Sequence, residues 1–193
     1  HLQRRRQRQM CIRDSNILYP EYLASLGIIP GIKVDAGAHP LAGTEDEKVT
    51  SGLDGLDDRL KEYRELGARF AKWRAVINIS SSNPSDYCIQ TNAHALARYA
   101  ALCQSNDIVP IVEPEILMDG EHDIEDSFVV TEEVLRTVFN ELYTQGVEFE
   151  EMVLKPNMVL SGYEAKERAD VDEVASATVQ CLSLIHISEP TRH

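Results

Sequence analysis

The sequence predicts an α/β protein that forms part of a (β/α)8 (TIM) barrel, with about four to five βα units. Short apolar segments alternate with helical patterns roughly every 40 residues, which favours a parallel sheet covered by helices. No G-x-G-x-x-G or Walker sequence follows any expected strand, which counts against the nucleotide-binding, doubly wound alternative. A complete barrel takes about 250 residues, so a chain of 193 residues would supply only a portion of one.

The first expected unit begins with a strand over 28–34, followed by a Gly-rich polar loop over 35–52. A helix is expected over 53–66, because Leu and Tyr residues recur there at three- and four-residue spacing. Gly67 is a typical stop signal for that helix.

The second strand is expected over 70–79, and Pro84 at a first helical position opens a helix that runs to about Ser105. The third strand is expected over 108–112, and its helix spans roughly 126–145 before Gly146.

The fourth strand is expected over 152–155, and a further helix begins over 171–179. Pro114 and Pro156 fit the ends of strands three and four, because proline lacks the N–H that a central ladder needs.

The two ends of the chain resemble translated DNA from the adapters of transposase-based sequencing libraries. One adapter encodes residues 5–14 in frame, and the adapter of the opposite strand encodes residues 182–192. We therefore expect residues 1–15 and 182–193 not to be native, and residues 16–181 to form one partial barrel domain. The alternative interpretation of the N-terminal segment is a basic arm that binds nucleic acid, because it contains a cluster of arginines: Arg4, Arg5, Arg6 and Arg8.

The composition excludes several classes of partner and site. Residues 16–181 keep 13 basic and 30 acidic residues, a net charge of about −17, which disfavours DNA and anionic membranes. The sequence contains no run of 18 apolar residues, so no membrane span is expected. Cys88, Cys103 and Cys181 are an odd, widely spaced set, typical of reduced cytoplasmic thiols. The three remaining histidines lack metal-ligand spacing, so we expect no metal and interpret them as ordinary surface or loop residues: His39, His94 and His122.

Ionisable residues cluster at the C-terminal end of every expected strand. Within each pair the spacing is two, so both side chains lie on the same face of the strand, and in a barrel that face can line the mouth where active sites are built. The set consists of Lys33 and Asp35, Lys72 and Arg74, Glu113 and Glu115, and Lys155. The alternative interpretation of any one of these residues is that it is charged simply because the end of its strand meets solvent.

These residue types favour imine chemistry on a sugar phosphate. A lysine amine is a poor nucleophile at neutral pH, and neighbouring cations and desolvation activate it, which Lys72 and Arg74 could do for Lys155. Imine formation also expels a hydroxyl that must be protonated, and Glu113 or Glu115 could supply that acid. Lys33 and Arg74 would then remain to bind phosphate.

Four segments in series resemble the class I fructose-1,6-bisphosphate aldolases, which cleave through a lysine Schiff base. Residues 31–35 (GIKVD) with 40–44 (PLAGT), 71–74 (AKWR), 111–117 (IVEPEIL) and 154–159 (LKPNMV) resemble the third to sixth strands of that family. The blocks at 52–56 (GLDGL) and 97–100 (ARYA) agree as well.

The resemblance implies a role for each candidate residue. It makes Lys155 the imine-forming nucleophile, Glu113 its acid/base and Glu115 a supporting acid. Lys72 would tune the lysine and Arg74 would help bind substrate, while Lys33, with Asp35 beside it, would bind a phosphate. The resemblance also implies a metal-independent enzyme without a cofactor, acting in glycolysis and its reverse, and a full-length parent that is often a homotetramer.

Two other interpretations stay open. One is a different lysine-imine barrel, such as a transaldolase or a deoxyribose-phosphate aldolase. The other is that this piece is inactive, because the family's first, second, seventh and eighth strands and its C-terminal tail are not represented. Those parts carry an aspartate near the Schiff base and the groups that hold the C1 phosphate, so we expect little or no turnover of fructose 1,6-bisphosphate.

Overall fold

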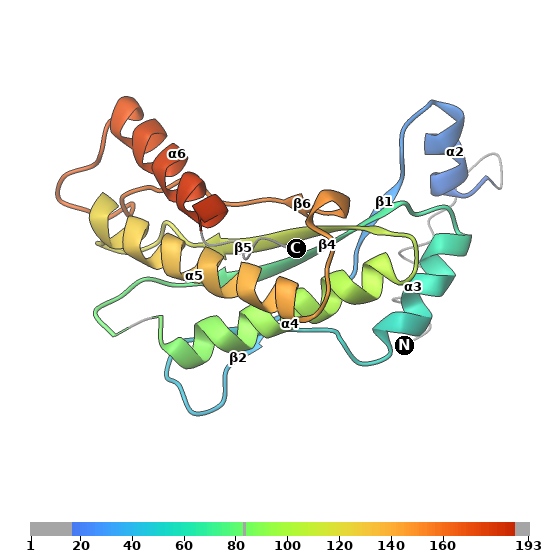
Figure 1. Ribbon diagram of the computed structural model, residues 1–193, viewed down its shortest axis with the longest axis horizontal. Helices are drawn as coiled ribbons and strands as arrows, with labels where there is room; N and C mark the ends of the chain where they lie inside the picture. The colour runs from blue at the N-terminus through green and yellow to red at the C-terminus, as the bar shows by residue number, and fades with distance from the viewer. Residues whose placement is uncertain (1–16, 83, 188–193) are drawn as a thin grey trace.

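The computed structural model describes residues 17–82 and 84–187, which form a parallel sheet with helices packed on one face (Figure 1). Four strands make up the sheet: β1 (Gly31–Lys33), β4 (Phe70–Ile77), β5 (Val109–Ile116) and β6 (Val153–Leu154). They lie side by side in sequence order, and every neighbouring pair is parallel. A doubly wound sheet reverses its strand order at a switch point, whereas these strands follow one direction of winding. This strand order agrees with the predicted partial barrel.

Helices α4 (Asp86–Gln104) and α5 (Ile124–Thr144) lie beside each other across the sheet, and α6 (Val171–Ile187) lies against α5 (Figure 1). Helix α3 (Leu56–Glu65) packs its buried leucines into the same core, and α2 (Tyr19–Ser25) precedes β1. The side chain of Asp123 caps α5 by accepting from the Asp126 N–H. Among the described residues, no helix is both long and apolar enough to cross a membrane.

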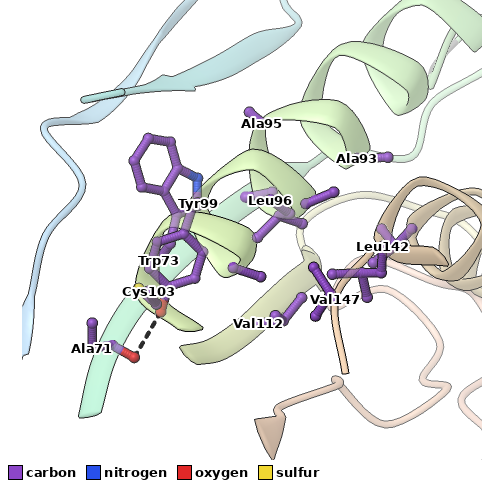
Figure 2. Packing of buried hydrophobic residues seen from close by; sticks show 14 of the residues in the cluster. Ala71, Trp73, Ala93, Ala95, Leu96, Tyr99, Cys103, Val112, Leu142 and Val147 are labelled. Carbon is purple, nitrogen blue, oxygen red and sulfur yellow. Dashed lines mark hydrogen bonds between the residues drawn. The ribbon is translucent and has the colours of Figure 1, made fainter. Parts of the chain in front are cut away.

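The main core lies between the sheet and α4. Trp73 and Tyr99 stack with their ring centroids 5.5 Å apart, beside Leu96 and Val112 (Figure 2). The Tyr99 hydroxyl reaches the carbonyl oxygens of Ala71 on β4 and Ile111 on β5, at 2.7 and 3.2 Å. Burial raises the pKa of Tyr99, so its hydroxyl keeps the proton that it donates to these two strands from the helix side of the sheet.

Several boundaries differ from the sequence prediction. The segment 35–52, expected to be a loop, contains the antiparallel strands β2 (Gly37–Pro40) and β3 (Lys48–Ser51). Pro84 does not occupy the first helical position, because Ser85 is the N-cap of α4 and accepts from the Cys88 N–H at 3.1 Å.

Pro114 lies inside β5 rather than at its end, so that expectation was wrong. The N–H groups of Val109 and Leu117 donate to the carbonyls of Arg69, directly before β4, and of Ile77 in β4, whereas the carbonyl of Val112 accepts from Lys155. Since alternate residues of a parallel strand bond to opposite neighbours, Pro114 faces the β6 side, beyond the last residue of β6. The proline therefore removes no bond between β5 and β4, and β5 continues to Ile116.

The expected boundary at residue 181 falls inside α6, which continues to Ile187. Leu182 packs against the small cluster formed by Leu135, Val159 and Cys181. The adapter origin of residues 182–193 stays a prediction, and that of residues 1–15 lies outside the described residues.

Candidate active site

The strand alternation places the charged candidates on the face of the sheet opposite the helices. In β4, Ala71, Trp73, Ala75 and Ile77 belong to the core under α4, so Lys72 and Arg74 point the other way. The same parity holds along β1, β5 and β6, where Val34, Val112 and Leu154 pack on the helix side. The expected same-face placement is therefore confirmed for all seven residues: Lys33, Asp35, Lys72, Arg74, Glu113, Glu115 and Lys155.

Glu113 lies at the centre of this face and bonds two lysines. Its side chain is only 3% exposed, and its Oε2 lies 2.7 Å from the Nζ of Lys72. Its Oε1 accepts from the Nζ of Lys155, which reaches over from the neighbouring strand. Burial acts to raise the pKa of Glu113, but the bonds to Lys155 and Lys72 outweigh it and hold the pKa below its ordinary value.

Because the pKa of Glu113 is lowered by folding, acid should weaken the fold through this residue. Its contribution is complete above the ordinary pKa of 4.5 and is lost as the pH falls through the lower folded value. We expect the unfolding free energy of the parent chain to drop more steeply below pH 4.5 than that of Glu113→Gln. Urea unfolding at a series of pH values measures the difference, and parallel curves for the two proteins would refute it.

Lys155 follows directly after β6 and stays in its register. Its N–H donates to the Val112 carbonyl at 2.9 Å, and the pairing of Leu154 with Val112 places it opposite Glu113. Its side chain is 56% exposed, so the amine is held by a buried carboxylate yet remains open to a ligand. This arrangement suits a nucleophile that must receive a substrate from solvent.

Two further ion pairs flank the central group. The guanidinium of Arg74 donates to Glu115, and the amine of Lys33 donates to Asp35. Lys33 is the register partner of Lys72 on β4, so the Lys33–Asp35 ion pair lies next to the strand that carries Lys72 and Arg74. The face as a whole carries four basic and three acidic side chains, in a chain with a net charge of −13. The local excess of cations is suited to an anionic ligand.

Asp35 lies deeper than a direct phosphate ligand would. Its side chain is 2% exposed, and its Oδ1 accepts from Lys33 and from the Gly37 N–H, the latter at 3.0 Å. A carboxylate in this position holds the Lys33 amine in place from below.

The side chains that hold the backbone of this face in place could not be identified from the sequence. Thr50 of the hairpin donates its hydroxyl to the Arg74 carbonyl at 2.7 Å, and Arg59 donates to the Val34 carbonyl at 2.9 Å and to that of Gly52. Asn157, two residues after Lys155, accepts from the Ile116 N–H at 3.1 Å. Only the position of Asn157 directly after Lys155-Pro156 could have drawn attention to it.

The histidines and cysteines lie apart from this face. His94 bonds Glu141 at 2.9 Å between two helices, and His39 is exposed on β2. His122 is in a loop as expected but is buried, which differs from a surface residue. Cys88, Cys103 and Cys181 are free and buried. Within the described residues, no group of three or more His, Cys, Asp or Glu side chains could hold a metal ion.

The family model of class I fructose-bisphosphate aldolase matches residues 10–186 of this chain. The chain belongs to the class I fructose-bisphosphate aldolase family. The matched range extends beyond residues 16–181 at both ends.

Curated aldolases share much of this sequence. A probable class 1 aldolase of Xylella fastidiosa is 59% identical over 168 residues, which cover 87% of this chain and 50% of that protein. One from Xanthomonas campestris pv. campestris is 61% identical over 164 residues, 85% of this chain and 49% of the relative. The cytosolic fructose-bisphosphate aldolase 4 of Arabidopsis thaliana is 50% identical over 168 residues, 87% of this chain and 43% of the relative. The chain thus spans about half the length of these aldolases.

A solved aldolase has the same fold. The fructose-bisphosphate aldolase of Plasmodium falciparum, crystallised with TRAP and a small molecule inhibitor, superposes with a TM-score of 0.86 at 47% identity. The match covers 90% of this chain and 50% of the solved chain. The four-stranded sheet is therefore one portion of an aldolase barrel.

Proposed function

We propose that the protein to which this chain belongs cleaves fructose 1,6-bisphosphate into dihydroxyacetone phosphate and glyceraldehyde 3-phosphate, and condenses them in reverse. Lys155 forms the Schiff base, and the reaction serves glycolysis and gluconeogenesis. The observation that carries the proposal is the contact of the Lys155 amine with Glu113, a buried carboxylate that also bonds Lys72.

Imine formation follows from that contact. Glu113 accepts the proton that the Lys155 ammonium must lose before its nitrogen lone pair attacks the C2 carbonyl of the ketose. The resulting carbinolamine carries a hydroxyl, and Glu113 returns the proton to it so that water leaves. Lys72 stays on the other carboxylate oxygen and keeps Glu113 oriented through both transfers.

Carbon–carbon cleavage uses the imine as an electron sink. The protonated imine accepts the electron pair of the C3–C4 bond, the C4 hydroxyl gives its proton to a base, and the aldehyde departs. The enamine that remains takes up a proton, and water then releases the ketone and regenerates the Lys155 amine. Because the protonated imine itself accepts the electron pair of the broken bond, this route needs neither a metal nor an organic cofactor.

Substrate phosphate is assigned to Lys33 and Arg74. Both cations are paired with carboxylates and are about half exposed, at 55% and 40% for their side chains. A phosphate group can take over part of these ion pairs, and Arg74 can bind it in a bidentate manner. Asp35 and Glu115 keep the two cations in place when no substrate is bound.

A second candidate is a chain that forms the imine without completing turnover. It is favoured by the length of this chain, which spans about half of its curated relatives. Within residues 17–82 and 84–187, the sheet also ends at β1 and β6, each of which has one strand neighbour there. A different lysine-imine aldolase is disfavoured, because the identity of 59% is to fructose-bisphosphate aldolases.

One pair of assays separates these possibilities. The purified chain is incubated with dihydroxyacetone phosphate and borohydride, and cleavage of fructose 1,6-bisphosphate is followed in parallel. Trapping together with cleavage at least about 10² slower than in a full-length relative is the expected result. Rapid cleavage by the 193-residue chain would refute the second candidate, whereas absence of trapping would refute imine chemistry in this chain.

Two properties of the whole protein belong to the same proposal. A cytoplasmic location is supported by the cytosolic Arabidopsis relative and by the buried free thiols. A homotetramer of the full-length parent is proposed from the family resemblance, and light scattering of that protein measures its mass directly.

A further inference from the structure

The main-chain ladder that holds Lys155 stops at that residue. The Lys155 N–H donates to the Val112 carbonyl at 2.9 Å. In a regular parallel ladder the Lys155 carbonyl would next accept from residue 114, which is a proline without an N–H. Pro114 therefore interrupts the pairing of the β6 segment with β5 beside the reactive amine.

Asn157 restores the pairing with its side chain. One regular step beyond Pro114, the carbonyl of residue 157 would accept from the Ile116 N–H. That N–H donates instead to the side-chain Oδ1 of Asn157, at 3.1 Å. The Nδ2 of Asn157 donates to the Met158 carbonyl at 2.8 Å, which fixes the orientation of the amide. The amide oxygen thus takes the place of the main-chain carbonyl of the same residue.

We infer that Asn157 is a positioning residue for imine formation, because its bond to Ile116 keeps the segment that carries Lys155 docked on the strand that carries Glu113. This inference rests on the proposed function. β6 contains only two residues, so few other bonds fix this segment to the sheet. The Lys155 side chain is more than half exposed and has four rotatable carbon–carbon bonds, so a small movement of its backbone takes the amine off Glu113.

The bond joins the two strands on either side of the reacting pair. On β5, Ile116 lies three residues after Glu113, and on the β6 segment Asn157 lies two residues after Lys155. The Val112–Lys155 bond closes the other side. Glu113 and Lys155 are therefore held between one main-chain bond and one side-chain bond, and without Asn157 only the first would remain.

Three substitutions test the inference. Asn157→Leu removes the acceptor at similar size, Asn157→Asp keeps an acceptor for the Ile116 N–H, and Asn140→Leu makes the first change on the exposed face of α5 as a control. The readout is borohydride trapping of dihydroxyacetone phosphate on the full 193-residue chain, with the maximal rate and the half-saturating concentration measured separately across pH.

We expect Asn157→Leu to lower the maximal trapping rate by about 10²-fold, because misplacing a reacting group by about 1 Å costs that much. The half-saturating concentration should hardly change, since Lys33 and Arg74 are untouched. Asn157→Asp should restore most of the rate, and Asn140→Leu should match the parent. The acid limb of the pH profile should also move in Asn157→Leu, because Glu113 loses one of the bonds that lower its pKa.

Equal maximal rates for Asn157→Leu and the parent would overturn the inference, as would an Asn157→Asp rate as low as that of the leucine variant. Hydrogen exchange along β4 and β5 checks that the sheet is intact, and Asn157→Ala replaces the leucine variant if it is not.

If the unsubstituted 193-residue chain traps no substrate, imine chemistry in this chain is refuted, and the positioning role is then judged without substrate. Acetylation of Lys155 by acetic anhydride, measured against the exposed Lys61, should rise several-fold in Asn157→Leu as the amine leaves Glu113. An unchanged ratio would overturn the positioning role by itself.

Discussion

Replacing Lys155 with methionine is expected to abolish the covalent adduct that borohydride traps with dihydroxyacetone phosphate. Methionine keeps an unbranched side chain of similar length but has no amine, so no imine can form at this position. Intact-mass spectrometry of the reduced protein measures the adduct. Lys61→Met is the matched control, because Lys61 is an exposed lysine on α3 that pairs with Asp57, and this variant should trap as the parent does.

Lys72 provides the sharpest contrast, since it contacts the same carboxylate as Lys155. Lys72→Met should slow trapping but leave the adduct detectable, because the nucleophile is still present. An adduct that persists in Lys155→Met and disappears in Lys72→Met would assign the imine to Lys72 instead.

Replacing Glu113 with glutamine is expected to slow imine formation by about 10² to 10⁴, the usual effect of removing a positioned acid/base. The amide keeps the shape of the carboxyl group but neither accepts the proton of Lys155 nor returns it to the carbinolamine. Rapid-quench trapping at saturating dihydroxyacetone phosphate measures the rate of this step.

Glu115→Gln is the control for charge on the same strand. Glu115 bonds Arg74 rather than either lysine, so its loss should weaken substrate binding more than it slows the imine step. If both glutamine variants slow imine formation to the same extent, Glu113 is not the specific proton carrier.

The sequence was a good guide wherever local chemistry repeats along the chain. Apolar strands separated by helical patterns predicted four parallel strands in order, and the two-residue spacing of Lys72 and Arg74 placed both on one face. The alternation of side chains between the two faces of a strand depends only on neighbouring residues, so it can be predicted without knowing which distant segments are in contact. The family resemblance added the register in which Lys155 meets Glu113.

The errors concern features that depend on partners distant in sequence. The 35–52 segment looked like a loop because it is polar and Gly-rich, yet β2 pairs with β3 and Thr50 is anchored by Asn92 of α4. Pro114 looked like a strand end, because the sequence does not reveal which neighbour its peptide faces. The depth of Asp35 was equally hidden, since burial depends on the packing of the surrounding strands.

The most direct test of the site is to locate the trapped adduct in the sequence. The parent chain is reduced with borohydride in the presence of dihydroxyacetone phosphate, digested, and mapped by tandem mass spectrometry. We expect the adduct on the peptide that contains Lys155, and on that residue alone. An adduct on Lys33 or Lys72, or one spread over several exposed lysines, would contradict the assignment of Lys155 as the nucleophile.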